Sequence, residues 1–585
     1  MHNVVLNRNQ LKVEKKKTQF CVVGGGMAGL CAALAAARSG IRTLLIQDRP
    51  VLGGNASSEV RMWICGAQSK DSKEGGILEE LMLRNMYYNG NNKYTIWDDI
   101  LYGACREEPL LEVIFNCSVN EVHSEGRQLK SIRAWHLTRH CWIDIEADFF
   151  SDCSGDSILS ICGAEVRWGR ESRHEFNESH APEEADNKTM GNSVLMQLRE
   201  VDEHRPFIAP PWAKKFNEQD LEHRGLNPSR GNFWWLEFGG LMNTIDDADK
   251  IREENMAIAY GAWDLIKNHP DGRGHNWELE WIGSLPGKRE NVRYVGDIVI
   301  NQNDIESEGR FEDVVCHGGW SMDDHHPDAI YHRGEPTIFH PAPTTYGIPY
   351  RSLYSKDMDN LYCAGRNISA THMAMSSTRV MGTTSLMGQA VGSAAAIAIK
   401  NGLSTRGVYE SALSMLQDKL REDDQYIPWS KRETIAVDTG AELSCLAANS
   451  EKLVNGIERG LGTDDNGAWL DDGQSISWTL TQAREIGGLR IVNDSDFDQT
   501  KRLPCSYPKG GNITQMPSHL LKAADVEILD ESGNWQRHCR IENNFRRLIQ
   551  LPLKVVSSGF RLSAIQSWGG KSVHLYSFDL SAEQF

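Results

Sequence analysis

The sequence lacks the features that mark membrane-spanning, disulfide-rich and nucleic-acid-binding proteins. No segment approaches 18 consecutive apolar residues, so no membrane-spanning helix is predicted. The 13 cysteines form no C-x-x-C pair, which favours reduced thiols over disulfides, zinc sites or iron–sulfur clusters. The formal net charge of -18 argues against a nucleic-acid surface, and the basic run Lys15 to Lys17 is interpreted as a solvated N-terminal segment. Because no signal peptide is visible, we expect a cytoplasmic protein.

A glycine-rich turn near the N-terminus separates a predicted strand from a predicted helix. The strand covers residues 18–23 and the helix residues 27–39. Between them, Gly24, Gly26 and Gly29 stand in G-x-G-x-x-G spacing. In this context the first glycine permits a tight turn, the second lets a pyrophosphate approach the backbone, and the third lets helix and strand pack closely. The helix N-terminus offers N–H groups to phosphates, which predicts a dinucleotide-binding loop.

A second predicted strand, residues 42–46, leads to the position that contacts the adenosine ribose in such folds. Gln47 occupies that position, and Asp48 follows it. Either side chain can form hydrogen bonds with ribose hydroxyls. The sequence therefore leaves the ribose contact open between these two residues.

Four further segments resemble the FAD-dependent oxidoreductases of the two-dinucleotide-binding-domain type. "IQDRPVLGGNASSEVRMW" (46–63) carries the paired glycines of that family. Residues 111–135 resemble its β-meander, 145–165 its strand ending in an S-G-D turn, and 358–399 its closing FAD motif. In the closing motif a strand ends in A-G-R, and a small-residue helix follows whose N-terminus would face the flavin pyrimidine ring. The resemblance covers roughly residues 18–425 and implies FAD as the cofactor.

The resemblance assigns FAD contacts to residues in each of these segments. From the glycine turn to the meander they are Gly24, Gly26, Met27, Ala28, Gly29, Gln47, Asp48, Arg49, Gly54, Asn55, Ser57, Ser58 and Val119. In the S-G-D turn and the closing motif they are Ser154, Gly155, Asp156, Gly365, Arg366, Gly382 and Thr383.

The predicted fold is α/β: a Rossmann-like FAD-binding domain with an inserted α+β substrate domain, plus a C-terminal all-β jelly-roll sandwich. The FAD-binding domain comprises residues 1–165 and 340–430, and the inserted substrate domain residues 166–339. Residues 421–434 are acidic and contain proline, which predicts a linker ahead of the sandwich at 436–585.

The C-terminal region alternates polar and apolar residues between turn signals, which predicts many short strands. Its segments "LVNGIE", "GAWLDDGQSISWTL", "EIGGLRIV" and "GFRLSAIQSWGGKSVHLYSFDL" resemble the discoidin, or galactose-binding-like, jelly-roll family. That resemblance leaves two roles open, which are carbohydrate binding and a packing or assembly role.

Histidines concentrate in residues 315–340, just before the chain returns to the FAD-binding domain. Oxidation of an alcohol requires a base for the hydroxyl proton, and histidine suits that task near neutral pH. His325 or His326 is the predicted base, and His372 is a second candidate. Arg379 is the predicted substrate-binding residue. Neighbouring aspartates could chelate a metal with these histidines, but the spacing matches no zinc pattern, so no metal site is predicted.

Finer motifs at 284–305, 346–354 and 365–382 resemble a branch of these flavoenzymes linked to sugar metabolism. This implies an FAD-dependent dehydrogenase that oxidises a secondary hydroxyl of a carbohydrate or polyol, with hydride transfer to flavin N5. The alternatives are a flavin-dependent carbon–carbon bond reductase or desaturase, and a non-catalytic flavin-bearing carbohydrate-binding protein. The expected partners are a small-molecule substrate, a sugar or glycoside, and an electron acceptor of unknown identity, without nucleic acid. The sequence is compatible with a homo-oligomer.

Overall fold

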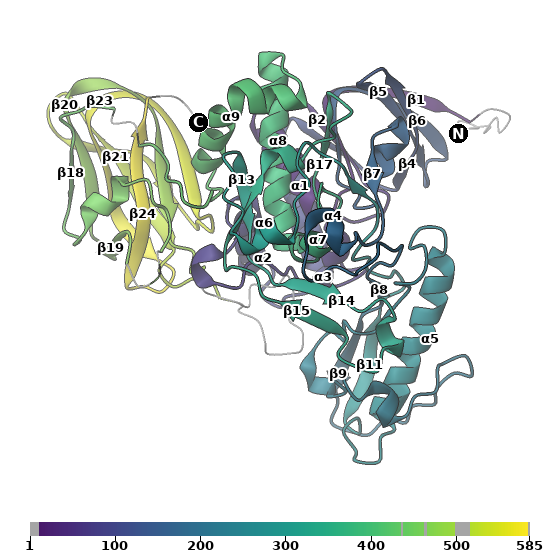
Figure 1. The fold of residues 1–585 in the computed structure, drawn as a ribbon. Coiled ribbons are helices and arrows are strands. Elements are labelled where there is room, and N and C mark those ends of the chain that lie inside the picture. The colour runs from purple at the N-terminus through teal and green to yellow at the C-terminus, as the bar shows by residue number, and fades with distance from the viewer. Residues whose placement is uncertain (1–10, 435–436, 461, 463–464, 498–514, 583–585) are drawn as a thin grey trace, which may run out of the picture. The chain divides into compact units, whose positions relative to one another are not determined.

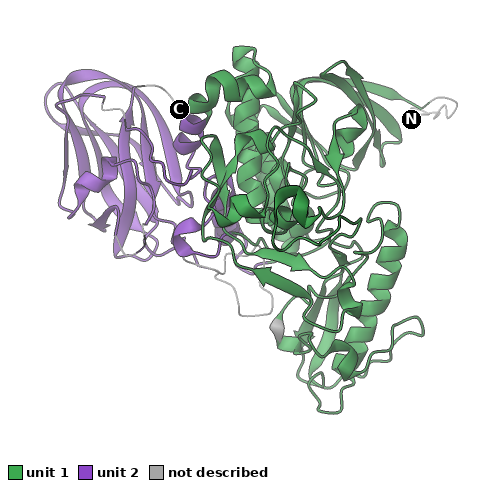
Figure 2. Ribbon diagram, viewed as in Figure 1, with its two compact units in different colours: residues 1–66, 93–416, 503–512 green, residues 67–92, 417–502, 513–585 purple. Residues whose placement is uncertain are grey.

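The computed structural model describes residues 11–434, 437–460, 462, 465–497 and 515–582 (Figure 1). These residues divide into two compact units, which Figure 2 shows in different colours. Among the described residues, unit 1 contains 11–66 and 93–416, and unit 2 contains 67–92 and those from 417 onward. Each unit has its own hydrophobic core.

Unit 1 is built on a mostly parallel seven-stranded sheet in the order β3-β2-β1-β6-β5-β4, with β17 also paired to β6. Five of the strands run parallel, whereas β4 and β5 form an antiparallel meander that continues from β6. This arrangement confirms the predicted Rossmann-like α/β class. The strands are β1 (Val13–Val23), β2 (Thr43–Ile46), β3 (Leu111–Ile114), β4 (Cys117–Glu125), β5 (Gln128–His136), β6 (Cys141–Asp152) and β17 (Leu361–Cys363).

Helix α1 (Met27–Arg38) follows β1 directly and packs against α8 (Met381–Asn401). A Cβ atom on Gly388 would lie 2.0 Å from Ala28 O, and Gly392 makes a similar approach, at 2.2 Å, one turn further along. The backbones of the two helices therefore touch, which requires glycine at these positions. The other helices of unit 1 are α3 (Tyr94–Arg106), α4 (Arg173–Phe176), α5 (Ala248–Lys267), α6 (Gln302–Glu306), α7 (His372–Thr378) and α9 (Thr405–Glu422), whose last residues belong to unit 2.

The residues between β6 and β17 form short antiparallel strand pairs. One core of this region surrounds α5 and contains the buried Trp235 and Trp263. The last hairpin, β14 with β15, carries much of the histidine-rich segment. The pairs are β7 (Val166–Arg167) with β12 (Arg293–Tyr294), β8 (Asn192–Ser193) with β10 (Glu237–Phe238), β9 (Met196–Glu200) with β11 (Trp277–Ile282), β13 (Val314–Gly318) with β16 (Tyr346–Pro349), and β14 (Met322–His325) with β15 (Thr337–His340).

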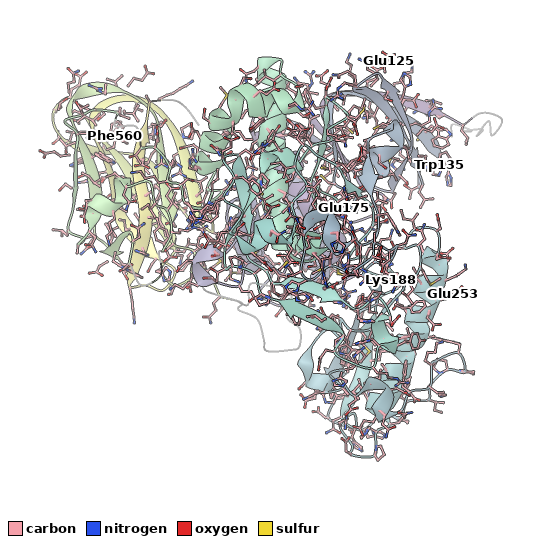
Figure 3. All side chains as sticks on the ribbon, viewed as in Figure 1. Glu125, Trp135, Glu175, Lys188, Glu253 and Phe560 are labelled. Carbon is pink, nitrogen blue, oxygen red and sulfur yellow. The ribbon has the colours of Figure 1, made fainter. Side chains whose placement is uncertain are left out.

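Unit 2 contains helix α2 (Gly76–Tyr88) and a seven-stranded antiparallel sheet in the order β19-β24-β20-β23-β21-β22, with β18 paired to β20. The long strands β20 and β23 shift register twice along their pairing, and the sheet curls around an apolar core that includes Phe560 (Figure 3). This confirms a separate antiparallel β-structure in the C-terminal region; the jelly-roll connectivity stays a prediction. The strands are β18 (Glu442–Cys445), β19 (Ala468–Asp471), β20 (Ile476–Asn493), β21 (Leu521–Leu529), β22 (Trp535–Ile541), β23 (Leu548–Ser567) and β24 (Ser572–Ser581).

The cysteines in the described parts of the chain are free thiols, and most of them are buried. Burial raises the pKa of Cys153, at the end of β6, to about 12, so this thiol stays protonated. Among the described helices, none combines the length and apolar character that crossing a membrane requires.

The contact between α1 and α8 predicts that Gly388→Ala destabilises unit 1, although alanine is the better helix former. The new Cβ would meet the backbone at Ala28 O, and overpacking of this kind costs about 1–3 kcal/mol. Thermal unfolding of the purified protein should show a lower midpoint. Gly90→Ala is the matched control, because nothing lies within 4 Å of a Cβ built there. Equal midpoints for the two variants would contradict the prediction.

Candidate active site

The glycine turn between β1 and α1 leaves open space at one of its three glycines. Gly24 has a φ of +102°, and a Cβ there would lie 2.5 Å from Cys153 O. A Cβ on Gly29 would lie 1.8 Å from Gly24 O, so the helix packs directly on the turn. At Gly26, by contrast, the nearest heavy atom to a Cβ is Gly54 Cα, 4.0 Å away. Since α1 begins after Gly26 without a side-chain cap, its first N–H groups and this space fit a diphosphate.

Gln47 is built into the glycine turn. Its Oε1 atom accepts a hydrogen bond from the Gly25 N–H at 2.7 Å, and its Nε2 atom donates to Val51 O at 3.0 Å. The side chain is buried, so both ends of the amide are used within the protein. The neighbouring Asp48 side chain is 61% exposed, which leaves its carboxylate better placed to reach ribose hydroxyls.

The other predicted FAD contacts of the N-terminal region lie in α1, in β4 and in the segment that follows β2. Gly53 N–H donates to Gly25 O at 2.8 Å, which holds the paired glycines against the turn. Met27 and Ala28 at the start of α1 and Val119 in β4 are buried. The remaining predicted residues are held by contacts within unit 1: Arg49 by Glu59, Asn55 by Lys288 O, Ser57 by Gly54 O, and the Ser58 N–H by Asp98.

An ion-pair cluster joins the carboxyl ends of the neighbouring parallel strands β6 and β17. Asp156 pairs with Lys288 at 2.6 Å and with Arg366 at 2.8 Å. Burial raises the pKa of Asp156, but these two cations lower it to about 2, so the carboxylate is ionised. Gly155 has a φ of +75°, and a Cβ there would lie 2.7 Å from Arg366 Cζ. The S-G-D turn, which begins at Ser154, and the A-G-R turn therefore meet, although Asp156 and Arg366 are 210 residues apart.

The start of α8 is tied to two other segments of unit 1. The Gly382 N–H donates to Cys65 O at 2.7 Å, and Thr383 is buried in the first turn. Arg379, just before α8, donates to the carboxylate of Asp323 at 3.2 Å and to its carbonyl at 3.1 Å. The helix end that is predicted to face the flavin thus lies next to the β14–β15 hairpin.

On one face of β14, a buried network surrounds His325. Strand alternation places Asp323 and His325 on the same face. His325 Nδ1 lies 2.7 Å from Glu237 Oε2, and His325 Nε2 lies 3.4 Å from Asp323 Oδ1. Arg289 pairs with Glu237 at 3.4 Å. The imidazole of His325 thus has two carboxylate neighbours, and each carboxylate is also paired with an arginine, Glu237 with Arg289 and Asp323 with Arg379.

A second buried network lies on the opposite face of β14, where Asp324 contacts His372. His372 Nδ1 lies 2.9 Å from Glu290 Oε1, and His372 Nε2 lies 3.0 Å from Asp324 Oδ1. Arg293 pairs with Glu290 at 2.6 Å and with Glu171 at 3.0 Å. Burial lowers the pKa of His372, but the two carboxylates beside its ring raise it to about 10. His372 is therefore protonated at neutral pH and donates through both nitrogens, so it cannot accept a proton there.

His326 lies outside both networks among the contacts that the structure describes. It follows β14 in a loop, its side chain is 36% exposed, and its ring stacks on His332 with centroids 3.6 Å apart. Burial, together with His332, lowers the pKa of His326. Of the three predicted bases, His325 alone combines burial with a carboxylate at one nitrogen and a longer, 3.4 Å contact at the other.

The sequence motifs do not identify Glu237, Glu290 or Arg289, which hold these networks together. Glu290 and Arg289 lie within the 284–305 segment that resembles flavoenzymes, so that segment contained a signal for them. Glu237 lies 88 residues before His325 in a short strand, and no local pattern connects the two residues.

The profile of the FAD dependent oxidoreductase family matches residues 19–420. This match spans more than half of the sequence, and the chain belongs to this family. No curated protein matches the chain.

Three solved structures show low similarity to the chain. A geranylgeranyl bacteriochlorophyll reductase-like protein from Thermoplasma acidophilum is 13% identical, with a TM-score of 0.31 over 70% of this chain and 84% of that chain. The family 32 carbohydrate-binding module of Streptococcus pneumoniae EndoD is 16% identical, with a TM-score of 0.18 over 25% of this chain and 97% of that chain. A two-domain protein of unknown function from Bacteroides fragilis NCTC 9343 is 17% identical, with a TM-score of 0.18 over 26% of this chain and only 45% of that protein.

FAD is the cofactor of this family, and the residues of the chain fit it. The space at Gly26 and the uncapped start of α1 suit the diphosphate. At the end of β17, Arg366 Nε and Asn367 Oδ1 are buried and have no hydrogen-bond partner among the described residues. Buried polar atoms are nearly always paired, so these two atoms suit a polar ligand. The predicted cofactor is confirmed.

Gly26→Val tests the cofactor loop directly. A branched side chain would fill the space that the diphosphate needs, so the purified variant should lack flavin absorbance at 450 nm, roughly where bound flavins absorb. Gly90→Val is the control in an open position, and it should stay fully loaded. A yellow Gly26→Val protein with a full complement of FAD would show that the diphosphate lies elsewhere.

His372→Gln tests the charge of the second network. Since Glu290 and Asp324 raise the pKa of His372 above its unfolded value, its stabilising contribution is present below about pH 6.5 and is lost as the pH rises toward about 10. The stability advantage of the wild type over His372→Gln should therefore shrink between pH 7 and 10, by at most about 1.4 kcal/mol per pH unit. Chemical denaturation across this range measures the difference. A constant difference would mean that His372 is not protonated in the folded protein.

Proposed function

We propose that the protein oxidises a secondary hydroxyl of a carbohydrate or polyol to a carbonyl. The observation that carries this proposal is the buried Glu237–His325 pair, which Asp323 and Arg379 connect to the start of α8. A carboxylate–imidazole pair is a common device for removing a hydroxyl proton. In this family the start of that helix borders the flavin, which supports a base at this position.

Glu237 sets the tautomer of His325 in the proposed mechanism. With Nδ1–H donated to Glu237 at 2.7 Å, the Nε2 atom carries a lone pair. Its 3.4 Å separation from Asp323 Oδ1 is too long for a strong hydrogen bond, so Nε2 can accept another proton. The substrate hydroxyl gives its proton to Nε2 while the hydrogen on the same carbon leaves as hydride. Bound FAD supplies the two-electron acceptor at N5.

Three buried polar atoms on the segments that lead into β14 and α8 suit a substrate with several hydroxyls. Trp320 Nε1, Ser321 Oγ and Arg379 Nε are buried and have no hydrogen-bond partner among the described residues. Sugar hydroxyls both donate and accept hydrogen bonds, so they can satisfy all three. Trp234 packs edge-on against His325 with ring centroids 5.3 Å apart, which adds an aromatic surface beside the base. The resemblance of the C-terminal region to galactose-binding-like domains supports the same substrate class.

Anaerobic mixing of the holoenzyme with a panel of glycosides and polyols tests the proposal. At least one of these compounds should bleach the flavin, and a dye acceptor should restore its colour. Bleaching by unsaturated or reducible compounds alone would favour the carbon–carbon bond reductase. Sugar binding without bleaching would favour the non-catalytic protein.

His325→Ala should slow flavin reduction by about 100-fold or more, the usual range for loss of a general base, while FAD content and the substrate Kd stay near wild type. Glu237→Gln should also slow reduction, because an amide can donate to Nδ1 and thereby move the ring proton to Nε2. His275→Ala, which removes a histidine from an exposed pair elsewhere in the same region, is the control. Wild-type reduction rates in both site variants would remove His325 from the mechanism.

A further inference from the structure

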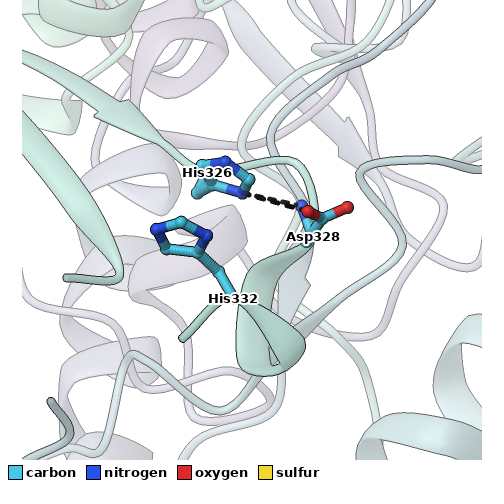
Figure 4. A group of neighbouring side chains, drawn as sticks. All are labelled: His326, Asp328 and His332. Atoms are coloured by element: carbon cyan, nitrogen blue, oxygen red, sulfur yellow. Dashed lines mark hydrogen bonds and ion pairs between the residues drawn. The ribbon is translucent and has the colours of Figure 1, made fainter. Parts of the chain in front are cut away.

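A cluster of side chains that could bind a metal ion lies directly after β14. His326, Asp328 and His332 flank the short helical turn Ala329–Tyr331 in the sequence, and their side chains lie close together (Figure 4). One ligand atom from each residue lies within 4.8 Å of the other two. Asp328 Oδ2 is 3.6 Å from His326 Nδ1, and the two imidazole rings are stacked at 13°. In the described parts of the chain, the hydrogen bonds and ion pairs of the networks around His325 and His372 do not include these side chains.

Hydrogen bonds from a buried arginine fix the loop that carries this cluster. Arg224 donates to Ala329 O at 3.0 Å, to His332 O at 3.1 Å and to Gly334 O at 2.8 Å. A Cβ on Gly334 would lie 2.8 Å from His332 Nε2, so the absence of a side chain there leaves room for the ring. The backbone holding His332 is therefore set before any ligand binds.

Backbone hydrogen bonds within the same loop also hold its shape. The Ala329 N–H donates to His326 O at 2.8 Å, and the His332 N–H donates to Ala329 O at 3.2 Å. Ala329 has a φ of +52°, a conformation that alanine rarely adopts and that these bonds and Arg224 maintain. Both histidines are thus anchored to one residue, which keeps their side chains on the same side of the turn.

We propose that His326, Asp328 and His332 bind a divalent transition-metal ion of the zinc type. Two imidazoles and one carboxylate are a donor set that Zn²⁺ accepts, with a water molecule at the fourth position. Tetrahedral ligands at ~2.0–2.1 Å from zinc lie ~3.4 Å apart, so ion binding requires the three side chains to rotate and the two stacked rings to tilt until both lone pairs point at the ion. Because the side chains of His326 and Asp328 are 36% and 48% exposed, an ion can enter from solvent. This site is separate from the proposed sugar oxidation.

Another stacked histidine pair of the same region provides the matched control. His204 and His275 stack with centroids 4.2 Å apart, but the nearest partner of His275 Nδ1 is the amide oxygen of Asn276, at 2.8 Å. This pair does not belong to a group of three metal-ligating side chains within the part of the chain that the structure describes. If stacking alone attracted metal, His275→Ala would lose zinc as readily as His332→Ala.

The test uses the FAD-loaded full chain, first dialysed against EDTA and then equilibrated with Zn²⁺ alone. Bound zinc is measured by mass spectrometry at matched FAD content. The wild type should bind one more zinc ion per chain than His332→Ala, and Asp328→Asn should bind this ion at least about tenfold more weakly. His275→Ala should match the wild type. Zn²⁺ should also raise the unfolding temperature of the wild type and of His275→Ala, but not that of His332→Ala.

Two results would overturn the proposal. The first is equal zinc content in the wild type, His332→Ala and Asp328→Asn, and the second is an equal loss in His275→Ala. Asp328→Asn keeps both imidazoles and changes no volume in the loop, so the test stays decisive even where His332→Ala fails to fold. Neither readout depends on sugar oxidation, so a failure here leaves the proposed enzymatic activity untouched.

Discussion

Around α1, main-chain atoms touch so closely that no side chain fits between them. These contacts determine where the neighbouring elements of unit 1 can lie. Gly29 rests on the carbonyl of Gly24, and Gly388 brings α8 onto the backbone of the same helix. Contacts between main-chain atoms leave little freedom, because protein interiors are packed as tightly as crystals. They fix the N-terminus of α1, where the diphosphate is predicted to bind, relative to the N-terminus of α8, which lies next to the β14–β15 hairpin. The cofactor and the proposed catalytic groups are thereby held on one rigid frame.

The hydrogen-bond partners of His372 and His325, two histidines close to the same strand, differ. His372 has a carboxylate at each ring nitrogen and remains charged, whereas His325 has one close carboxylate and a second contact at 3.4 Å. At His372 the two carboxylates outweigh the effect of burial and raise the pKa of the ring to about 10. The two rings meet different carboxylates because side chains alternate along β14, so that Asp323 and Asp324 point to opposite faces of the strand. The two faces of one strand thus separate the charged His372 from His325, the proposed base.

The buried ion pairs of unit 1 hold side chains in position more than they stabilise the fold. An ion pair removed from water gains little net free energy, but losing one partner leaves an uncompensated charge that costs several kcal/mol. Asp156 with Arg366, and Glu237 with Arg289, therefore resist displacement even where they do not stabilise the fold. Arg224 has a different role, since it donates to carbonyl groups of the loop behind β14. The loop that carries the proposed metal site is therefore fixed by contacts that are separate from the hydrogen bonds around His325.

The sequence by itself determined the features that depend on residues close to one another along the chain. The glycine turn, helix 27–39 and the Rossmann-like class follow from local spacing and hydrophobic pattern, and so does the expectation of FAD. Lys15 and Lys17 are exposed, as predicted for a solvated run, but pairing with β6 extends β1 back to Val13, ahead of the predicted strand start at residue 18. Only the tertiary structure paired Glu237 with His325 and Glu290 with His372, across 88 and 82 residues. Contacts over such separations leave no period in the sequence, since they form when distant segments pack together.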